Sequence, residues 1–229
     1  MKDKIKLVIF DMDGLMVDTE SICIKAWDKV FNNYKIKVEK EFYFEIIGSS
    51  AKVLEEKIKH RKILKDNLKF EDILNVQRKE AANIVEKEGI TKKEGIEELL
   101  GYLENKGIKK AVASSSFRTK VNKFLTITGL IDKFDYIVAG DEVKDSKPAP
   151  DLYLNVIEKF GIDNQNIIIL EDSKNGLTAA KRAGLEKRIY IPDIVILSSE
   201  EEKNLVYKKF NNLLEVKEKL ENNKDTLWS

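Results

Sequence analysis

The chain has 229 residues, and its 41 Lys and Arg against 40 Asp and Glu give a formal net charge of +1. This balance argues against a protein that binds nucleic acid or a membrane surface through charge. The single cysteine excludes an intrachain disulfide and a multi-thiolate zinc site, and it is typical of a reducing, cytoplasmic compartment. No apolar run approaches the roughly 18 residues of a transmembrane helix, and Asp11 interrupts the first run too early for a secretory signal.

Short apolar runs rich in branched residues alternate with helical segments over most of the chain. The predicted strands are 5–10, 109–114, 136–139, 166–170 and 188–191, and the predicted helices between them are 95–105, 117–128, 151–160 and 176–183. This alternation is typical of βα units around a parallel sheet. We therefore predict an α/β fold whose core is a Rossmann-like, doubly wound parallel sheet.

The alternation breaks once, after the first strand, where the segment 18–89 looks only helical. Its apolar stripes predict three to five helices, with residues 34–44 as a connector. Both ends of the segment lie beside the sheet, so we expect a small helical cap joined to the core by two crossings, which permit hinge motion. The predicted domains are a cap of 18–89 and a catalytic core of 1–17 and 90–229.

Polar clusters follow the predicted strands at the end where open α/β sheets bind their ligands. They are Asp11-Met12-Asp13-Gly14 after the first strand, Ser114-Ser115-Ser116 after the second, Ser146-Lys147-Pro148 in the third connection and Glu171-Asp172-Ser173 after the fourth. Each cluster alone is more often a turn, a loop or a helix cap. Four of them at one edge of a sheet instead supply the carboxylates, hydroxyl and ammonium that a divalent cation and a phosphoryl group require.

Two carboxylates in the first cluster have the spacing that phosphoryl transfer needs. The carboxylate of Asp11 can attack phosphorus and form an aspartyl-phosphate, which divides one difficult displacement into two. Asp13 lies on the same side of an extended chain, because side chains repeat with period two, and it can act as the acid and base at the leaving oxygen. We therefore predict Asp11 as the nucleophile and Asp13 as the acid/base.

An anionic nucleophile repels a phosphate dianion unless a hard cation cancels the charge, so we expect Mg²⁺. The predicted metal ligands are Asp11, Asp172, Asp13 through its backbone carbonyl and Glu171 through a bound water. Ser114, Ser115 and Lys147 are expected to hold the phosphoryl oxygens.

In these motifs the chain resembles the haloacid dehalogenase superfamily, and within it the β-phosphoglucomutase-like phosphatases. The resemblance covers nearly the whole chain and rests on Phe10-Asp11-Met12-Asp13-Gly14, Val112-Ala113-Ser114-Ser115-Ser116, Ser146-Lys147-Pro148-Ala149-Pro150-Asp151 and Leu170-Glu171-Asp172-Ser173. It implies Mg²⁺-dependent phosphoryl transfer through the first Asp, under a helical cap that closes over the substrate.

The chain departs from the true mutases of this family in the cap. They carry an Arg shortly after the glycine that corresponds to Gly48, where this chain has Ser49-Ser50-Ala51-Lys52, and a His where it has Cys23. Both departures favour hydrolysis, since a mutase must hold a bisphosphate while it reorients. Lys52 is a partial substitute for the Arg, without its bidentate fork. The resemblance also suggests that Lys79 faces the substrate.

The sequence thus predicts a cytoplasmic, Mg²⁺-dependent phosphatase of small phosphorylated metabolites, with sugar phosphates as the favoured class. It is expected to be a monomer or weak dimer, with no nucleic-acid or membrane partner. Two alternatives stay open: a hexose-phosphate mutase, and a catalytically silent protein that binds phosphorylated metabolites.

Overall fold

The computed structural model describes residues 5–47, 49, 51–64 and 68–222. The chain divides into two compact units, a core of Met1–Val17 with Thr91–Ser229 and a helical unit of Asp18–Ile90. Within the described ranges, every helix is too short or too polar to span a bilayer. A cap that covers the substrate, a cytoplasmic location and the oligomeric state stay predictions.

Six strands in the described part of the core form one parallel sheet with the order β3-β2-β1-β4-β5-β6. They are β1 (Leu7–Phe10), β2 (Lys109–Ala113), β3 (Tyr136–Val138), β4 (Ile167–Glu171), β5 (Lys187–Tyr190) and β6 (Lys208–Lys209). The predicted doubly wound α/β fold is confirmed. The sequence did not indicate β6, because two lysines form no apolar run. The order places β1 between β2 and β4, at the point where the connections change direction and such sheets bind ligands.

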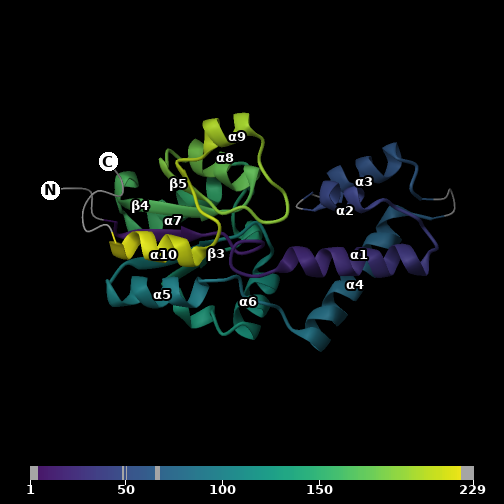
Figure 1. The fold of residues 1–229 in the computed structure, drawn as a ribbon, viewed down its shortest axis with the longest axis horizontal. Helices are drawn as coiled ribbons and strands as arrows, with labels where there is room; N and C mark the ends of the chain where they lie inside the picture. Colours follow the sequence, from purple (N-terminus) through teal and green to yellow (C-terminus); the bar gives the residue numbers. More distant parts are fainter. Residues whose placement is uncertain (1–4, 48, 50, 65–67, 223–229) are drawn as a thin grey trace. The chain divides into compact units, whose positions relative to one another are not determined.

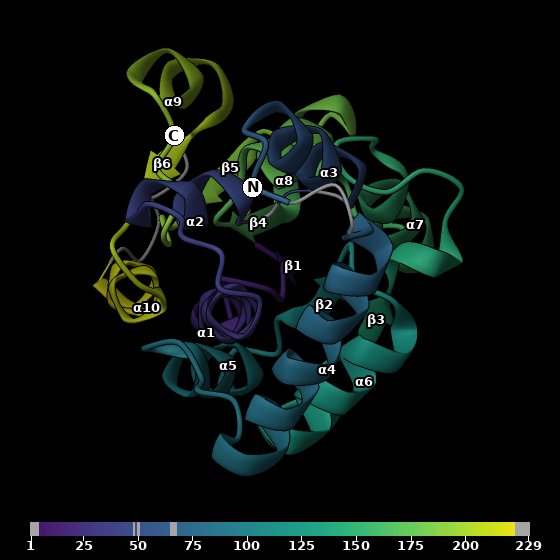
Figure 2. The same ribbon diagram turned by 90° about the vertical axis from the view of Figure 1, so that its right-hand side faces the viewer.

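Helices cover both faces of the sheet, which is why all four residues of β1 are buried. The helices of the core are α5 (Ile96–Asn105), α6 (Arg118–Ile127), α7 (Asp151–Phe160), α8 (Lys174–Arg182), α9 (Ser199–Leu205) and α10 (Leu213–Asn222). Figure 2 shows α7 and α8 on one side of the sheet and α5 and α10 on the other. Leu7 and Ile9 point toward α7 and α8, where they share a buried cluster with Val156 and Ala180.

The helical unit contains four helices among its described residues: α1 (Thr19–Asn33), α2 (Lys40–Ile46), α3 (Ala51–His60) and α4 (Phe70–Glu88), drawn in purple to blue in Figure 1. Its buried cluster is rich in aromatic side chains, and Trp27 stacks on Phe31 with ring centroids 5.1 Å apart. The predicted connector 34–44 was wrong in its second half. There Phe42 and Ile46 lie one turn apart, and α2 buries both of them in this cluster.

The two chain segments that lead to the helical unit begin side by side in the core. The backbone N–H of Lys93 donates to the carbonyl of Met16 at 2.8 Å, and Val17 pairs with Lys92 in an antiparallel bridge. Gly95 follows with φ +84°, and a Cβ there would lie 2.0 Å from the backbone nitrogen of Leu214 at the start of α10. Only glycine permits this close approach.

Candidate active site

Three carboxylates meet where β1 and β4 end. Oxygens of Asp11, Glu171 and Asp172 lie within 4.8 Å of one another. Their proximity follows from strand register, because Phe10 is paired with Leu170 and the next residue of each strand is an acid. Asp11 is buried, and Glu171 is completely shielded from solvent.

Lys147 compensates two of these charges. Its Nζ lies 2.6 Å from Oδ1 of Asp11 and 2.5 Å from Oε1 of Glu171, and its side chain is only 4% exposed. The hydroxyl of Tyr153, on α7, donates to the same Glu171 oxygen at 2.8 Å, and the Lys147 ammonium lies 5.2 Å from the centre of the Tyr153 ring. Lys147 is thus fixed in position by two carboxylates and an aromatic ring.

Glycines make room for two of the carboxylates. A Cβ on Gly176 would lie 1.8 Å from Oε1 of Glu171, and a Cβ on Gly14 would lie 2.2 Å from Oδ2 of Asp172. Ser173 completes the surroundings of Glu171, since its hydroxyl lies 3.0 Å from Oε2 and also accepts from the Gly176 N–H as the N-cap of α8. Larger residues at 14 or 176 would displace the carboxylates.

Burial and mutual repulsion alter the ionisation of this cluster. Burial raises the pKa of Asp11 to about 7, against the opposing attraction of Lys147 and with a further contribution from Glu171. Burial disfavours the charged form of Lys147, but Asp11 and Glu171 outweigh it and hold its pKa well above the ordinary value. The pKa of Tyr153 is also raised, by burial and by Glu171. Ionisable groups with such strongly shifted pKa values are typical of functional sites.

Asp13 is held by the segment that follows β2. The hydroxyl of Ser116 donates to Oδ2 of Asp13 at 2.7 Å, and Nζ of Lys120, in the first turn of α6, lies 2.8 Å from Oδ1. Ser114 is fully buried, and its hydroxyl accepts from the N–H of Ser116 at 3.1 Å, whereas Ser115 is exposed. The structure thus brings Asp13 next to the serine cluster, as the strand order requires.

Sequence reasoning missed three of these contacts. Tyr153 looks like an apolar residue of α7, and nothing in the sequence shows that its hydroxyl reaches Glu171. Ser116 belongs to the predicted serine cluster but was given no contact with Asp13, and Lys120 lies in the first turn of α6, where no sequence pattern linked it to Asp13. The contacts of Glu171 in the structure are Lys147, Tyr153 and Ser173, and its expected place beside a metal-bound water stays a prediction.

The predicted substrate residues of the helical unit lie on its surface. Lys52 and Lys79 are both exposed, and Lys52 lines a hollow of about 440 Å³ together with Asn75 and Arg78. Gly48 and Ser50, on which the comparison with mutases partly rests, lie outside the described residues. Cys23 is half-buried, and its sulfur lies 3.8 Å from Nε2 of Gln77. The roles of Lys52 and Lys79 stay predictions.

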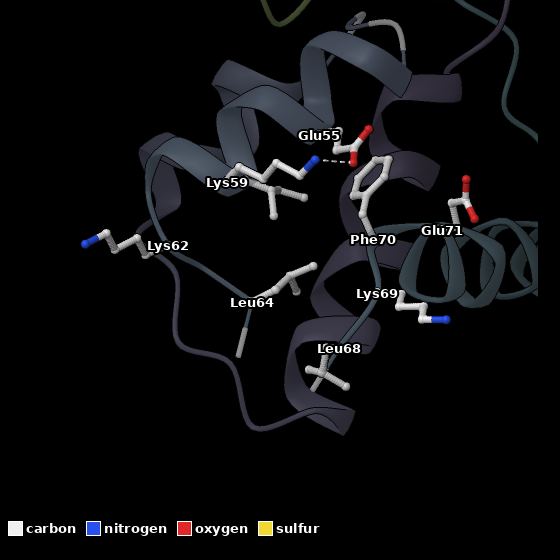
Figure 3. Close-up of a pocket in the computed structure, with 9 residues that line it drawn as sticks. Glu55, Lys59, Lys62, Leu64, Leu68, Lys69, Phe70 and Glu71 are labelled. Atoms are coloured by element: carbon white, nitrogen blue, oxygen red, sulfur yellow. Dashed lines mark ion pairs between the residues drawn. The ribbon is translucent and has the colours of Figure 1, made fainter. Parts of the chain in front are cut away.

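A second hollow of the helical unit, of about 690 Å³, lies between α3 and the start of α4. Figure 3 shows apolar side chains at its centre, among them Leu64, Leu68 and Phe70, and a pair formed by Glu55 and Lys59 at 2.6 Å. Its charged groups lie at or near the surface, and none of them is a buried carboxylate like those at the ends of β1 and β4. The cluster at the ends of β1 and β4 is therefore the candidate active site.

Comparisons with known proteins show which proteins the chain is similar to. Residues 8–189 match the family model of the haloacid dehalogenase-like hydrolases. The chain is 34% identical to the phosphorylated carbohydrates phosphatase of Thermotoga maritima, over 80% of this chain and 83% of the relative. It is 29% identical to the phosphoglycolate phosphatase of Aquifex aeolicus, over 85% and 89% of the two chains. A crystal structure of mutant CbbY from Rhodobacter sphaeroides in complex with xylulose-(1,5)bisphosphate superposes with a TM-score of 0.74 and 26% identity, over 92% and 96% of the chains.

Proposed function

Because the chain belongs to the haloacid dehalogenase-like hydrolases and is a phosphatase of that family, we propose that it hydrolyses monophosphate esters of sugars through a phosphorylated Asp11 with the help of Mg²⁺. One observation carries the proposal: a buried carboxylate, Asp11, lies 2.6 Å from a buried ammonium and within 4.8 Å of two further carboxylates. This set combines a nucleophile, a cation site and an anchor for a phosphoryl group.

The residues present fit Mg²⁺. It prefers oxygen ligands, and Asp11, Glu171 and Asp172 offer oxygens within one coordination sphere of each other. The absence of a side chain at Gly14 and Gly176 leaves the carboxylates room at this edge. When bound, Mg²⁺ supplies positive charge that offsets the repulsion between the Asp11 carboxylate and the phosphate dianion.

In the first half of the reaction Asp11 attacks phosphorus and Asp13 protonates the leaving oxygen. A carboxylate oxygen of Asp11 forms a bond to phosphorus as the bond between phosphorus and the ester oxygen breaks. Asp13 gives its proton to the departing sugar oxygen. Lys147 and the Ser114 hydroxyl hold the phosphoryl oxygens, and Lys147 offsets part of their negative charge.

In the second half the acyl phosphate is hydrolysed. Asp13, now a carboxylate, removes a proton from a water molecule, and the water oxygen attacks phosphorus. The bond between phosphorus and Asp11 breaks, which releases phosphate and restores both carboxyl groups to their starting states. Ser116 and Lys120 contact both oxygens of Asp13, so they determine where this carboxyl group lies.

The sugar class is supported by similarity. The relative from Thermotoga maritima is named for phosphorylated carbohydrates, and the CbbY structure carries a sugar bisphosphate. The Aquifex relative is named for phosphoglycolate, so the test must reach beyond sugars.

The decisive experiment measures phosphate release with Mg²⁺ over a panel of sugar, glycolate, glycerol and nucleotide monophosphates. Asp11→Asn is the matched blank, because it keeps the shape of the side chain and loses the nucleophile. We expect release that disappears in the variant and a highest kcat/KM on a sugar phosphate. Activity of Asp11→Asn within tenfold of wild type would contradict the covalent mechanism.

The same panel separates the alternatives. Conversion of β-glucose 1-phosphate to glucose 6-phosphate without phosphate release would identify a mutase. Failure to turn over any ester, together with failure to bind beryllium fluoride at Asp11, would identify a binding protein.

A further inference from the structure

The loop between β5 and α9 brings a fourth carboxylate to the candidate active site. Asp193 lies in this loop and its side chain is only 13% exposed. Its Oδ1 lies 2.6 Å from Nζ of Lys93. Its Oδ2 is buried and, among the described residues, has no hydrogen-bond partner. One end of this carboxylate is therefore neutralised while the other stays unsatisfied.

The unsatisfied oxygen faces the carboxylate cluster. A Cβ on Gly14 would lie 3.2 Å from Oδ2 of Asp193 and 2.2 Å from Oδ2 of Asp172, so both carboxylates approach the same space beside Gly14. Asp193 lies outside the group of three whose oxygens fall within 4.8 Å of one another. It is thus near the predicted cation without being one of its direct ligands.

A buried carboxylate oxygen without a donor is costly, so a donor is expected when the site is complete. No described side chain supplies one, whereas Mg²⁺ in proteins usually keeps several of its waters, and these donate strongly. We propose that Asp193 is a positioning residue that accepts a hydrogen bond from a water bound to the cation at Asp11, Glu171 and Asp172. This inference rests on the proposed function.

Lys93 contacts the other oxygen of Asp193, Oδ1, and its role differs from the role proposed for Oδ2. It neutralises Asp193 through Oδ1, while its own backbone N–H donates to the Met16 carbonyl at 2.8 Å. The pair therefore joins the loop after β5 to the segment that leads out of the helical unit. If Asp193 served only to form this link, loss of Asp193 and loss of Lys93 would change Mg²⁺ binding equally.

Calorimetric titration of the metal-free protein with MgCl₂, at 0.15 M KCl and without substrate, tests the proposal. Asp193→Asn keeps the shape and an acceptor for Lys93, but it places an NH₂ donor where the acceptor must be. We expect Asp193→Asn and Asp193→Ala to weaken Mg²⁺ binding by about tenfold or more, the usual effect of losing such a partner. Lys93→Met, the matched control, keeps Oδ2 and should bind Mg²⁺ within about threefold of wild type.

The double variant Asp193→Ala with Lys93→Met separates hydrogen bonding from charge, since it removes one charge of each sign. It should remain about tenfold weaker than wild type. Recovery to within threefold would show that only the local charge matters, and would overturn the proposal. Equal weakening by Lys93→Met and Asp193→Asn would also overturn it, in favour of a purely structural link.

Two measurements keep these outcomes interpretable. Urea unfolding identifies any variant that fails to fold, and Asp193→Asn, the least disruptive change, then decides alone. Mg²⁺ binding by wild type with unchanged affinity in both Asp193 variants would overturn the proposal and leave the phosphatase assignment intact. Absence of both Mg²⁺ binding and phosphate release in wild type would overturn the proposed function itself.

Discussion

Two lysine–glutamate pairs, one in each unit of the molecule, have nearly the same geometry and different surroundings. Lys147 and Glu171 of the core approach to 2.5 Å with side chains 4% and 0% exposed. Lys59 and Glu55 of the helical unit approach to 2.6 Å with side chains 70% and 37% exposed. Distance therefore does not distinguish the pair in the candidate active site from the pair on a helix surface. Exclusion of water does, because it makes each buried charge dependent on its partner.

After Asp11→Asn, the largest effect on the core side is expected from Asp13→Ala, which removes the proposed acid beside the buried cluster. Departure of a poor leaving group needs a proton, so hydrolysis of a sugar phosphate should slow by about 10²–10⁴-fold. An activated aryl phosphate leaves without that help and should lose much less. Steady-state kcat on both substrates checks this. An equal loss on the two esters would show that Asp13 is not the acid.

Lys147→Met tests how far the buried charges depend on each other. It leaves Asp11 and Glu171 without their shared cation, so the free energy of unfolding of the metal-free protein should fall by about 3 kcal/mol or more. Urea denaturation measures this loss, and Mg²⁺ should restore part of it by supplying positive charge. Stability within about 1 kcal/mol of wild type would contradict the idea that burial makes this pair indispensable.

The raised pKa of Asp11 predicts how stability changes with pH. Burial raises it from 3.8 to about 7, so between about pH 4 and 7 the folded protein keeps a proton that the unfolded chain releases. The contribution of Asp11 to the free energy of unfolding therefore falls as pH rises through this window and is constant above it. We expect metal-free wild type to lose about 1 kcal/mol or more relative to Asp11→Asn between pH 5 and 7.5, measured by urea denaturation. Parallel pH profiles of the two proteins would contradict the shift.

The smallest effect is expected from Lys59→Met, the same substitution made in the exposed pair. Water and salt screen this interaction, so unfolding should change by about 0.5 kcal/mol or less. Phosphatase activity should depend on Lys147 and not on Lys59. A cost similar to that of Lys147→Met would show that solvent exposure does not separate the two regions.

The contrast between buried residues of the core and exposed residues of the helical unit also explains how much of the site the sequence could predict. The carboxyl ends of parallel strands meet at one edge, so Asp11, Ser114 and Glu171 could be placed together from the strand pattern alone. The contacts of Tyr153, Lys120 and Asp193 depend on how helices and loops pack on the sheet, and no short-range pattern encodes that. The substrate contacts of Lys52 and Lys79 stay predictions for a related reason, since exposed side chains are constrained by a ligand rather than by neighbours.

The sheet order also has a consequence for the growing polypeptide. β1 leads directly to Asp11 and is the first strand of the sheet to be synthesised, yet it pairs with β2 (Lys109–Ala113) and β4 (Ile167–Glu171). Its apolar residues therefore have no partner strand until β2 has been made, and one edge of β1 stays unpaired until β4 follows. Pairing over such separations is slow. We expect Leu7–Phe10 to be the segment most in need of protection from aggregation during synthesis, because the strand that precedes the proposed nucleophile is made first and enclosed late.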